Sequence, residues 1–278
     1  MKNRLSNNRW HPANLMSIVV IGFMFAMQSP SSYAAECEKT VRWNDDVPYS
    51  SRNEQGILTG FYVELVRDAL QKMGCSAKFV EMPWARALLE LEAGRLDILP
   101  GALQNEQRNR FALFSTIVNT SPNVLFVAKP SLEKFKLKKL DDIMGSDFKL
   151  GVQINVSYGP RFDELIKIPA FSTRLTPVYT RRNGWKMLEL GRIDGLIADE
   201  ATGLIELQQL ALRELITKSD VIASNDSAMV AFSKKTINAA FVDRFNKTFH
   251  SMIANGEYAR IRERNIPCKV SIQTLACK

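Results

Sequence analysis

Apolar residues recur at helical spacing in residues 84–115 of the chain. Leu88 and Leu91 fall on one side of the predicted helix and charged residues lie between them, which is typical of an amphipathic helix that packs on a core. Gly94 ends this helix, because glycine adopts the left-handed conformation after a last helical turn without a Cβ penalty. The short apolar run at residues 96–99 then predicts a strand.

The same unit occurs a second time. Residues 91–99 read LEAGRLDIL and residues 188–196 read LELGRIDGL, and a tryptophan precedes each copy, Trp84 in the first and Trp185 in the second. Two copies of one helix-glycine-strand unit predict two α/β lobes of similar design. In such folds ligands bind where the strands end, so we expect a functional cleft between the lobes.

The remaining pattern predicts an α/β fold with two lobes, each a mainly parallel sheet flanked by helices. Strand-like runs at residues 123–131 and 229–235 are interpreted as two hinge strands that cross between the lobes. Lobe one is therefore expected to comprise residues 35–127 plus 232–278, and lobe two residues 128–231. The long amphipathic helix near the C-terminus is expected to pack back on lobe one.

The first residues of the chain have the pattern of an export signal. A basic start precedes an apolar run at residues 15–27, and small residues follow, with Ser32 and Ala34 three positions and one position before the expected cut. This predicts a cleaved signal peptide over residues 1–34 and a periplasmic protein. The alternative is an uncleaved membrane anchor, although the run is short for a span of ~20 residues.

Removal of residues 1–34 takes away three basic residues and no acidic one, which lowers the formal net charge from +8 to +5. The remaining charges are interspersed along the sequence. A mildly basic chain of this kind has no nucleic-acid-binding patch, and its charge serves solubility.

Export would place the cysteines where disulfides persist. Cys37 and Cys75 each precede a strand-like run, and in an α/β unit these would be adjacent parallel strands that start at the same edge, so we pair them. Cys268 then pairs with Cys277 across the C-terminal tail. There is no Cys-x-x-Cys spacing, and His250 is the single histidine of the mature chain. We therefore expect no metal site and no cofactor, and we do not expect a Ser-His-Asp hydrolase.

Several motifs in order resemble one known family. They are GILTGFYVELVRDAL, GRLD, FS, GRIDGLIADEA and ANGEYARI. Together they resemble the bacterial extracellular solute-binding proteins of family 3, the periplasmic amino-acid-binding proteins of ABC importers, which share a two-lobed type II periplasmic-binding fold. The resemblance implies a monomer that closes around an amino acid or related zwitterion and delivers it to an inner-membrane permease, with no enzymatic activity.

The resemblance also implies which residues bind the ligand. Arg108, six residues before Phe114 of the FS motif, matches the arginine that binds the ligand carboxylate through two parallel hydrogen bonds. Ser157, at a predicted helix start, matches a second carboxylate ligand, and Asp199 matches the aspartate that receives the ammonium group. The alternative for Ser157 and for Asp199 is a role limited to capping a helix.

Aromatic residues are expected to hold the apolar body of the ligand. Trp84 matches an aromatic that stacks on the ligand, and Tyr49, after the proline of the first loop, is expected to close one side of the pocket. Arg86, two residues after Trp84, is also expected to face the cleft. Trp185 is assigned to packing.

Two loops depart from the family pattern. Residues 100–105 lack the usual hydroxyl side chains, which leaves the backbone amides of Gly101 and Ala102 as donors. The first loop carries Asp45 and Asp46 in place of the usual aromatic. Acidic groups at one end and an arginine at the other favour a zwitterionic or amine-bearing ligand larger than glycine.

Two other functions are compatible with the same fold. One is a periplasmic enzyme resembling cyclohexadienyl dehydratases, for which Glu200, beside Asp199, is the one candidate for a general acid or base. The other is a ligand-sensing partner of a membrane receptor.

Overall fold

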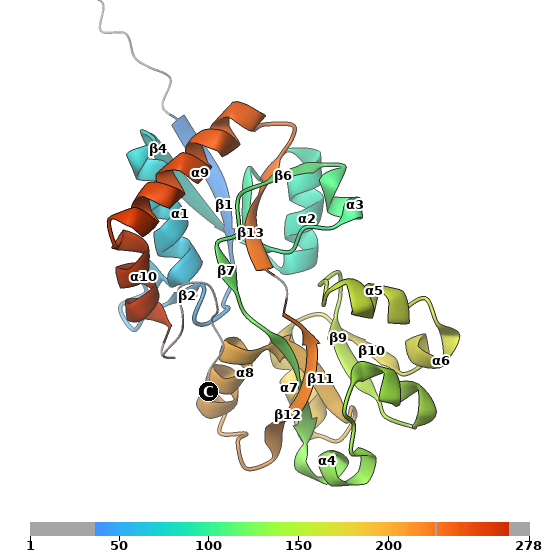
Figure 1. Cartoon of the computed structure of the whole chain (residues 1–278). Helices are drawn as coiled ribbons and strands as arrows, with labels where there is room; N and C mark the ends of the chain where they lie inside the picture. The colour runs from blue at the N-terminus through green and yellow to red at the C-terminus, as the bar shows by residue number, and fades with distance from the viewer. Residues whose placement is uncertain (1–36, 226, 267–278) are drawn as a thin grey trace, which may run out of the picture. The chain divides into compact units, whose positions relative to one another are not determined.

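The computed structural model describes residues 37–225 and 227–266, and the predicted signal peptide at 1–34 and the predicted pair Cys268–Cys277 lie outside them. The described chain forms two lobes, each built on one sheet (Figure 1). Lobe one has the strand order β4 (Cys75–Glu81), β1 (Cys37–Trp43), β5 (Ile98–Ala102), β13 (Ser227–Ser233) and β6 (Ala112–Phe114), and β7 (Asn119–Thr120) also pairs with β13. Lobe two has the order β10 (Leu175–Val178), β9 (Leu150–Gln153), β11 (Gly195–Asp199), β8 (Asn123–Ala128) and β12 (Ile216–Ser224).

Both sheets contain three parallel strands and are completed by antiparallel pairs. The triplets β4-β1-β5 and β10-β9-β11 are parallel, as predicted. The strands β13 and β8 run antiparallel to their neighbours, because each enters its sheet from the other lobe. The predicted lobe boundaries, after residues 127 and 231, fall inside β8 and β13, whereas the chain changes sheet before each strand begins. The short stretches that make the change carry no apolar pattern, so the sequence does not mark them.

Helices cover both sheets. Those of lobe one are α1 (Phe61–Lys72), α2 (Trp84–Ala93), α3 (Glu106–Asn109), α9 (Ala239–Ala254) and α10 (Glu257–Asn265), and a small hairpin joins β2 (Ser51–Arg52) to β3 (Leu58–Thr59). Those of lobe two are α4 (Lys129–Phe135), the 3-10 helix η1 (Leu140–Gly145), α5 (Pro160–Leu165), α6 (Pro169–Ser172), α7 (Arg181–Glu189) and α8 (Glu200–Gln209). None of the helices in the described part of the chain is long and apolar enough to cross a membrane.

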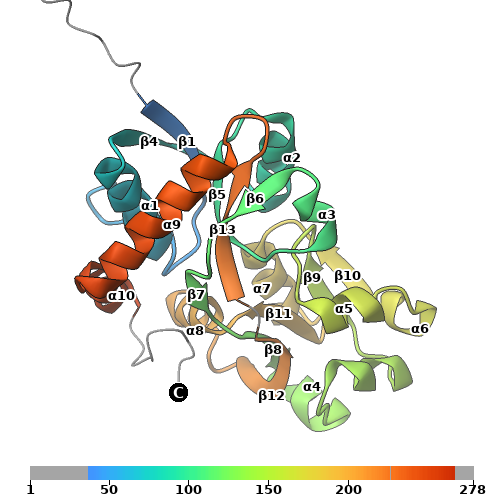
Figure 2. The same ribbon diagram turned by 45° about the horizontal axis from the view of Figure 1, so that its top comes forward.

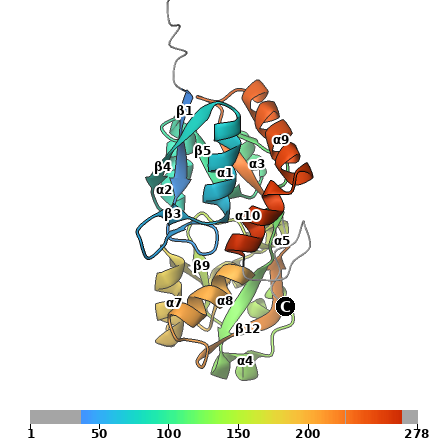
Figure 3. The same cartoon turned by 90° about the vertical axis from the view of Figure 1, so that its left-hand side faces the viewer.

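The C-terminal helices belong to lobe one, as predicted. Helices α9 and α10 lie beside α1 (Figure 3). Phe245 and Phe249 of α9 and Tyr258 of α10 share a buried cluster with Phe61 and Leu65 of α1. Helix α2 packs on other residues of the same lobe, in a cluster with β5, β6 and β13 (Figure 2). Lobe one therefore has helices on both faces of its sheet.

The repeated helix-glycine-strand unit is present in both lobes. Helix α2 ends at Gly94 with φ 78°, and helix α7 is followed by Gly191 with φ 64°. The aspartate of each unit fixes the neighbouring strand: the Asp97 carboxylate accepts the backbone N–H of Thr40 at 2.8 Å, and the Asp194 carboxylate accepts that of Lys149 at 2.8 Å. The two copies of GRxD thus have the same structural role.

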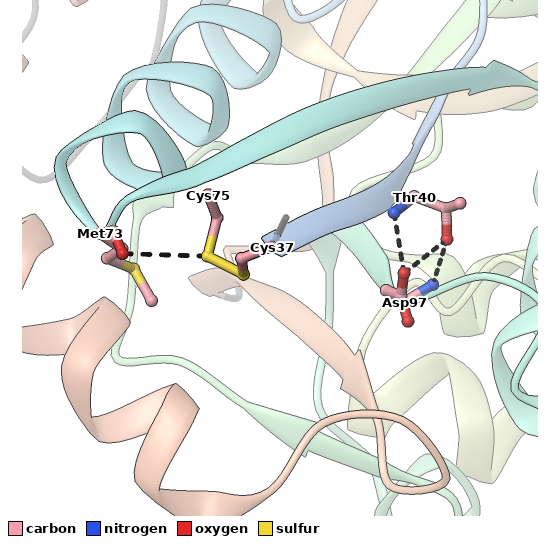
Figure 4. Close-up of a disulfide and its surroundings, with 5 residues drawn as sticks. All are labelled: Cys37, Thr40, Met73, Cys75 and Asp97. Atoms are coloured by element: carbon pink, nitrogen blue, oxygen red, sulfur yellow. Dashed lines mark hydrogen bonds between the residues drawn. A yellow bond between two sulfur atoms is a disulfide. The ribbon is translucent and has the colours of Figure 1, made fainter. Parts of the chain in front are cut away.

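The Cys37–Cys75 disulfide is confirmed (Figure 4). It joins the first residues of β1 and β4, which are directly opposite each other in a parallel pair, with their Cα atoms 4.5 Å apart. Figure 4 also shows the hydrogen bonds of Thr40 with Asp97 further along β1. The bridge and these hydrogen bonds fix β1 to both of its neighbours.

Candidate functional site

A cavity with a volume of about 280 Å³ lies between the two lobes at the ends of β1, β5 and β11. Six of the residues predicted to bind a ligand line it: Tyr49, Trp84, Gly101, Arg108, Ser157 and Asp199. The first four come from lobe one and the last two from lobe two. This position, outside the carboxyl ends of parallel strands, is where open α/β sheets bind ligands.

Arg108 is held in the cavity by its own short helix. Asn105 caps α3, and its Oδ1 accepts the backbone N–H of Arg108 at 2.9 Å. Arg108 is buried, with 5% of the residue exposed. Its guanidinium donates to the carbonyl of Leu103 at 2.7 Å and to the carbonyl of Asn155, in lobe two, at 3.2 Å. Burial lowers the pKa of Arg108 to about 10, with Asp163 acting in the opposite direction, so the group remains charged at neutral pH.

Trp84 is the first residue of α2 and faces the cavity as predicted. Its indole Nε1 donates to the carbonyl of Asn155 at 3.1 Å, the same carbonyl that Arg108 contacts. The guanidinium carbons of Arg108 and of Arg42 each lie 5.6 Å from the centre of the indole ring, within the range of cation–π attraction. The ring therefore contacts two cations in the cavity.

Asp199 caps a helix and also lines the cavity. It lies at the end of β11 and caps α8, where its Oδ1 accepts the backbone N–H of Thr202 at 2.9 Å. Its Oδ2 accepts the hydroxyl of Tyr49, from lobe one, at 3.1 Å and also that of Ser121. Burial raises the pKa of Asp199 above its ordinary value.

Tyr49 forms part of an aromatic wall. Its ring stacks on that of Tyr62 with centres 4.9 Å apart, and the Tyr62 hydroxyl donates to Oδ1 of Asn119 at 2.5 Å. Burial raises the pKa of both tyrosines well above the ordinary value. Gly101 lies against this wall with φ 78°, and a Cβ there would stand 2.7 Å from the Tyr62 ring. Gly101 thus makes room for Tyr62.

A buried ion-pair cluster that the sequence analysis missed closes the other side of the cavity. Arg181, at the start of α7, donates to Asp46 of lobe one at 2.6 Å and to Glu206 of α8 at 2.8 Å. Glu206 also accepts the indole N–H of Trp185, which is fully buried as predicted. Burial opposes the charge of Arg181, but the two carboxylates outweigh burial and hold its pKa well above the ordinary value.

A sequence signal for this cluster exists. Asp45 and Asp46 are adjacent in the first loop, and Arg181 and Arg182 are adjacent in lobe two. The outer pair, Arg182 with Asp45, has its charged atoms 3.4 Å apart, and both side chains are about 60% exposed. Two complementary charge pairs in facing loops could have indicated the contact.

Two of the predicted ligand-binding residues do not line the cavity. Arg86 pairs with Glu90 on the same helix at 2.5 Å, its side chain is 64% exposed, and it does not line the cavity. Arg86 is two residues after Trp84, about 200° around the helix, and therefore lies on the other side of α2 from the cleft. Ala102 is fully buried in lobe one and pairs with Met229 of β13, so its amide does not reach the cavity.

The structure also changes the interpretation of Ser157 and Glu200. Ser157 lines the cavity from a loop, because α5 begins at Pro160 and is capped by Gly159. Glu200, the candidate general acid or base, is 3% exposed, lies outside the cavity lining and accepts Lys218 Nζ at 2.5 Å. Within residues 37–225 and 227–266, no group of three or more His, Cys, Asp or Glu side chains could hold a metal ion.

Two sheets of this topology with a polar cavity between them define a two-lobed periplasmic-binding-protein-like fold. The chain belongs to the bacterial extracellular solute-binding proteins, family 3, which match residues 40–267.

Relatives with established ligands share this fold. The histidine-binding periplasmic protein of Escherichia coli (strain K12) is 23% identical over 192 residues, which cover 66% of this chain and 69% of that protein. The L-cystine-binding protein of the same strain is 23% identical over 158 residues, 56% of each chain. An ABC uptake transporter substrate-binding protein from Streptococcus pneumoniae, solved with bound histidine, has a TM-score of 0.71 at 20% identity and covers 84% of this chain and 94% of that chain.

Proposed function

We propose that this solute-binding protein captures an α-amino acid in the cavity and delivers it to an ABC permease of the inner membrane. The observation that carries the proposal is that Arg108 and Asp199 face one cavity from opposite lobes. A guanidinium and a carboxyl group in these positions match the carboxylate and the ammonium of an α-amino acid. The names of the relatives, histidine- and cystine-binding proteins, support the same class of ligand.

Closure of the lobes is the mechanism. Trp84 and Arg108 of lobe one donate to Asn155 of lobe two, and Tyr49 donates to Asp199. A ligand that contacts both lobes stabilises this closed arrangement by every contact that an open arrangement lacks. The permease then recognises the closed form, and the protein acts as a monomer in the periplasm after removal of residues 1–34.

The experiment is thermal unfolding of the mature, oxidised protein against a panel of amino acids. A ligand at a hundredfold excess over its Kd stabilises the native state by about 2.7 kcal/mol, a shift of several degrees. In Arg108→Ala we expect no shift at the same concentrations, because the ligand carboxylate would be buried without a partner. Arg110→Ala, at an exposed position two residues away, is the control and keeps the full shift.

Two outcomes would overturn the proposal. One is near-normal affinity in Arg108→Ala, and the other is the lack of any shift across the panel. The enzymatic alternative is not favoured, because Glu200, the carboxylate that the sequence suggested for it, pairs with Lys218 outside the cavity lining. We therefore propose a binding protein and not an enzyme.

A further inference from the structure

Arg42 is a cavity residue that the family resemblance does not identify. It is the next-to-last residue of β1, is 8% exposed and lines the cavity. Its Nε donates to the carbonyl of Met82 at 3.1 Å, which fixes the plane of the guanidinium. The terminal nitrogens make no hydrogen bond with any other residue of the described chain.

No carboxylate neutralises this guanidinium directly. Across residues 37–225 and 227–266, none lies within ion-pair distance of Arg42. Asp46 is the nearest acidic influence, but its carboxylate is paired with Arg181 at 2.6 Å. Burial accordingly lowers the pKa of Arg42, and the Arg181 charge lowers it further while Asp46 raises it. The guanidinium therefore faces the cavity without a carboxylate partner from the described residues, which suits it to pair with an anion bound there.

Arg42 and Arg108 both line the cavity beside Trp84. Their guanidinium carbons are both 5.6 Å from the centre of the Trp84 indole. A ligand whose carboxylate binds Arg108 beside this ring therefore also has the guanidinium of Arg42 near the ring. Two such groups around one indole favour a ligand with two acidic groups.

Most of the carboxylates that line the cavity are already paired with arginines. Four arginines and four carboxylates line it, so their formal charges cancel and the pairing decides what is available. Glu206 and Asp46 are both engaged by Arg181, and Asp45 lies on the exposed rim with Arg182. Only Asp199 remains for a ligand ammonium, so a ligand with a cationic side chain finds no second unpaired acid in the cavity lining.

We infer that Arg42 is a second anion-binding residue of the cleft, and that the preferred ligand is an amino acid with a second carboxylate. The inference rests on the proposed function and adds the ligand class to it. Arg108 binds the α-carboxylate, Asp199 the ammonium, and Arg42 the side-chain carboxylate through the paired N–H groups of its guanidinium.

The test compares acids with amides of the same shape. Calorimetric titration of the mature protein with L-glutamate, L-aspartate and L-2-aminoadipate is set against L-glutamine, L-asparagine and L-arginine. In the wild type we expect one of the acids to bind at least about tenfold more tightly than any amide or L-arginine. In Arg42→Gln we expect a loss on the order of 100-fold for the acid and less than about threefold for its amide. Arg42→Lys, which keeps the charge but not the fork, recovers part of the loss.

The outcomes separate this inference from the proposed function. If an amide or L-arginine binds most tightly, or if Arg42→Gln lowers only the melting temperature and leaves the acid-to-amide ratio unchanged, Arg42 is a packing residue and the inference fails. If Arg108→Ala still abolishes binding in that case, the proposed function stands. If no amino acid binds the wild type, both fail. Should Arg42→Gln not fold, the wild-type ratio and the Arg42→Lys variant decide.

Discussion

At Asp199 the two carboxylate oxygens have different partners, a backbone amide of α8 for Oδ1 and the hydroxyls of Tyr49 and Ser121 for Oδ2. The cap fixes the side chain, and the hydroxyls hold its second oxygen at the cavity wall. Because burial raises the pKa of Asp199, the folded protein holds this proton more tightly than the unfolded chain does. The stability that protonation contributes is then present at low pH and is lost as pH rises through the folded-state pKa.

Asp199→Asn should therefore change stability in a pH-dependent way. Relative to the wild type, the ligand-free variant gains free energy of unfolding as pH rises from about 4, the ordinary value, and the difference levels off above the folded-state pKa. Urea unfolding at a series of pH values measures this. A difference that is constant across the series would contradict the assignment. Amino-acid affinity of the wild type should fall as pH is lowered through the same range, because the ammonium loses its charged partner.

Gly101 is a residue-scale requirement of the aromatic wall. Gly101→Ala adds a Cβ 2.7 Å from the Tyr62 ring at a position with φ 78°. The ring cannot move away easily, because it stacks on Tyr49 and its hydroxyl is hydrogen-bonded to Asn119. We expect a loss of about 2–4 kcal/mol in free energy of unfolding. Gly56→Ala is the matched control, since Gly56 has φ 75° and open space around it, and should cost about 1 kcal/mol. Equal losses would show that the Tyr62 contact is unimportant.

At the scale of elements, helix α3 links a cap to the site. It is one short turn, Glu106–Asn109, and Asn105 caps it through the amide of Arg108 itself. Asn238 caps the longer helix α9 in the same way, with its Oδ1 accepting the amide of Phe241 at 3.0 Å. The two caps are chemically alike, but only the first holds a residue of the cavity.

Asn105→Ala and Asn238→Ala should thus be similar in stability and different in binding. Each should lower the free energy of unfolding by about 1 kcal/mol, the usual cost of a lost N-cap. Only Asn105→Ala should also weaken amino-acid binding, because the amide and guanidinium of Arg108 are no longer fixed. Denaturant unfolding and calorimetric titration of the pair give both readouts. Unchanged affinity in Asn105→Ala would mean that the guanidinium contacts alone fix Arg108.

Elements of the fold were more predictable than the site. The helix-glycine-strand repeat, the Cys37–Cys75 bridge and the return of the C-terminal helices to lobe one all follow from local pattern or from strand order. The sequence does not show to which of the two sheets β8 and β13 each belong, because the apolar pattern of a strand is the same in either sheet.

The site was predictable only where a motif fixed it. Arg108 and Asp199 follow from motif positions. Arg86 was misplaced because two residues along a helix turn the side chain about 200° away from Trp84, where it pairs with Glu90 instead. Arg42 and Arg181 were missed because their roles depend on residues far away in the sequence.

At the scale of the whole described chain, the lobes meet through buried and exposed ion pairs that are independent of Asn155. Arg181 joins Asp46 across the lobes and Glu206 within lobe two, with its side chain 16% exposed. The neighbouring pair of Arg182 with Asp45 lies at the rim. Burial makes the first cluster structurally important, whereas water screens the second.

Arg181→Ala should lower the free energy of unfolding by about 3–5 kcal/mol, because the buried Glu206 and the partly buried Asp46 both lose their partner. Arg182→Ala should change it by less than about 1 kcal/mol, as is usual for an exposed pair. Thermal and denaturant unfolding at low and high salt measure both. A small effect of Arg181→Ala would show that Asp46 and Glu206 find other partners or take up protons.

The structural role of the GRLD and GRID segments bears on how the ligand preference of the protein can change. Asp97 and Asp194 each fasten a neighbouring strand, and neither lines the cavity. Both aspartates support the fold and lie outside the cavity lining, so a change of ligand requires no change in either of them. The segments that reveal the family and the side chains that choose the ligand are thus separate, and a substitution at Arg42 would alter ligand preference while GRLD and GRID stay as they are.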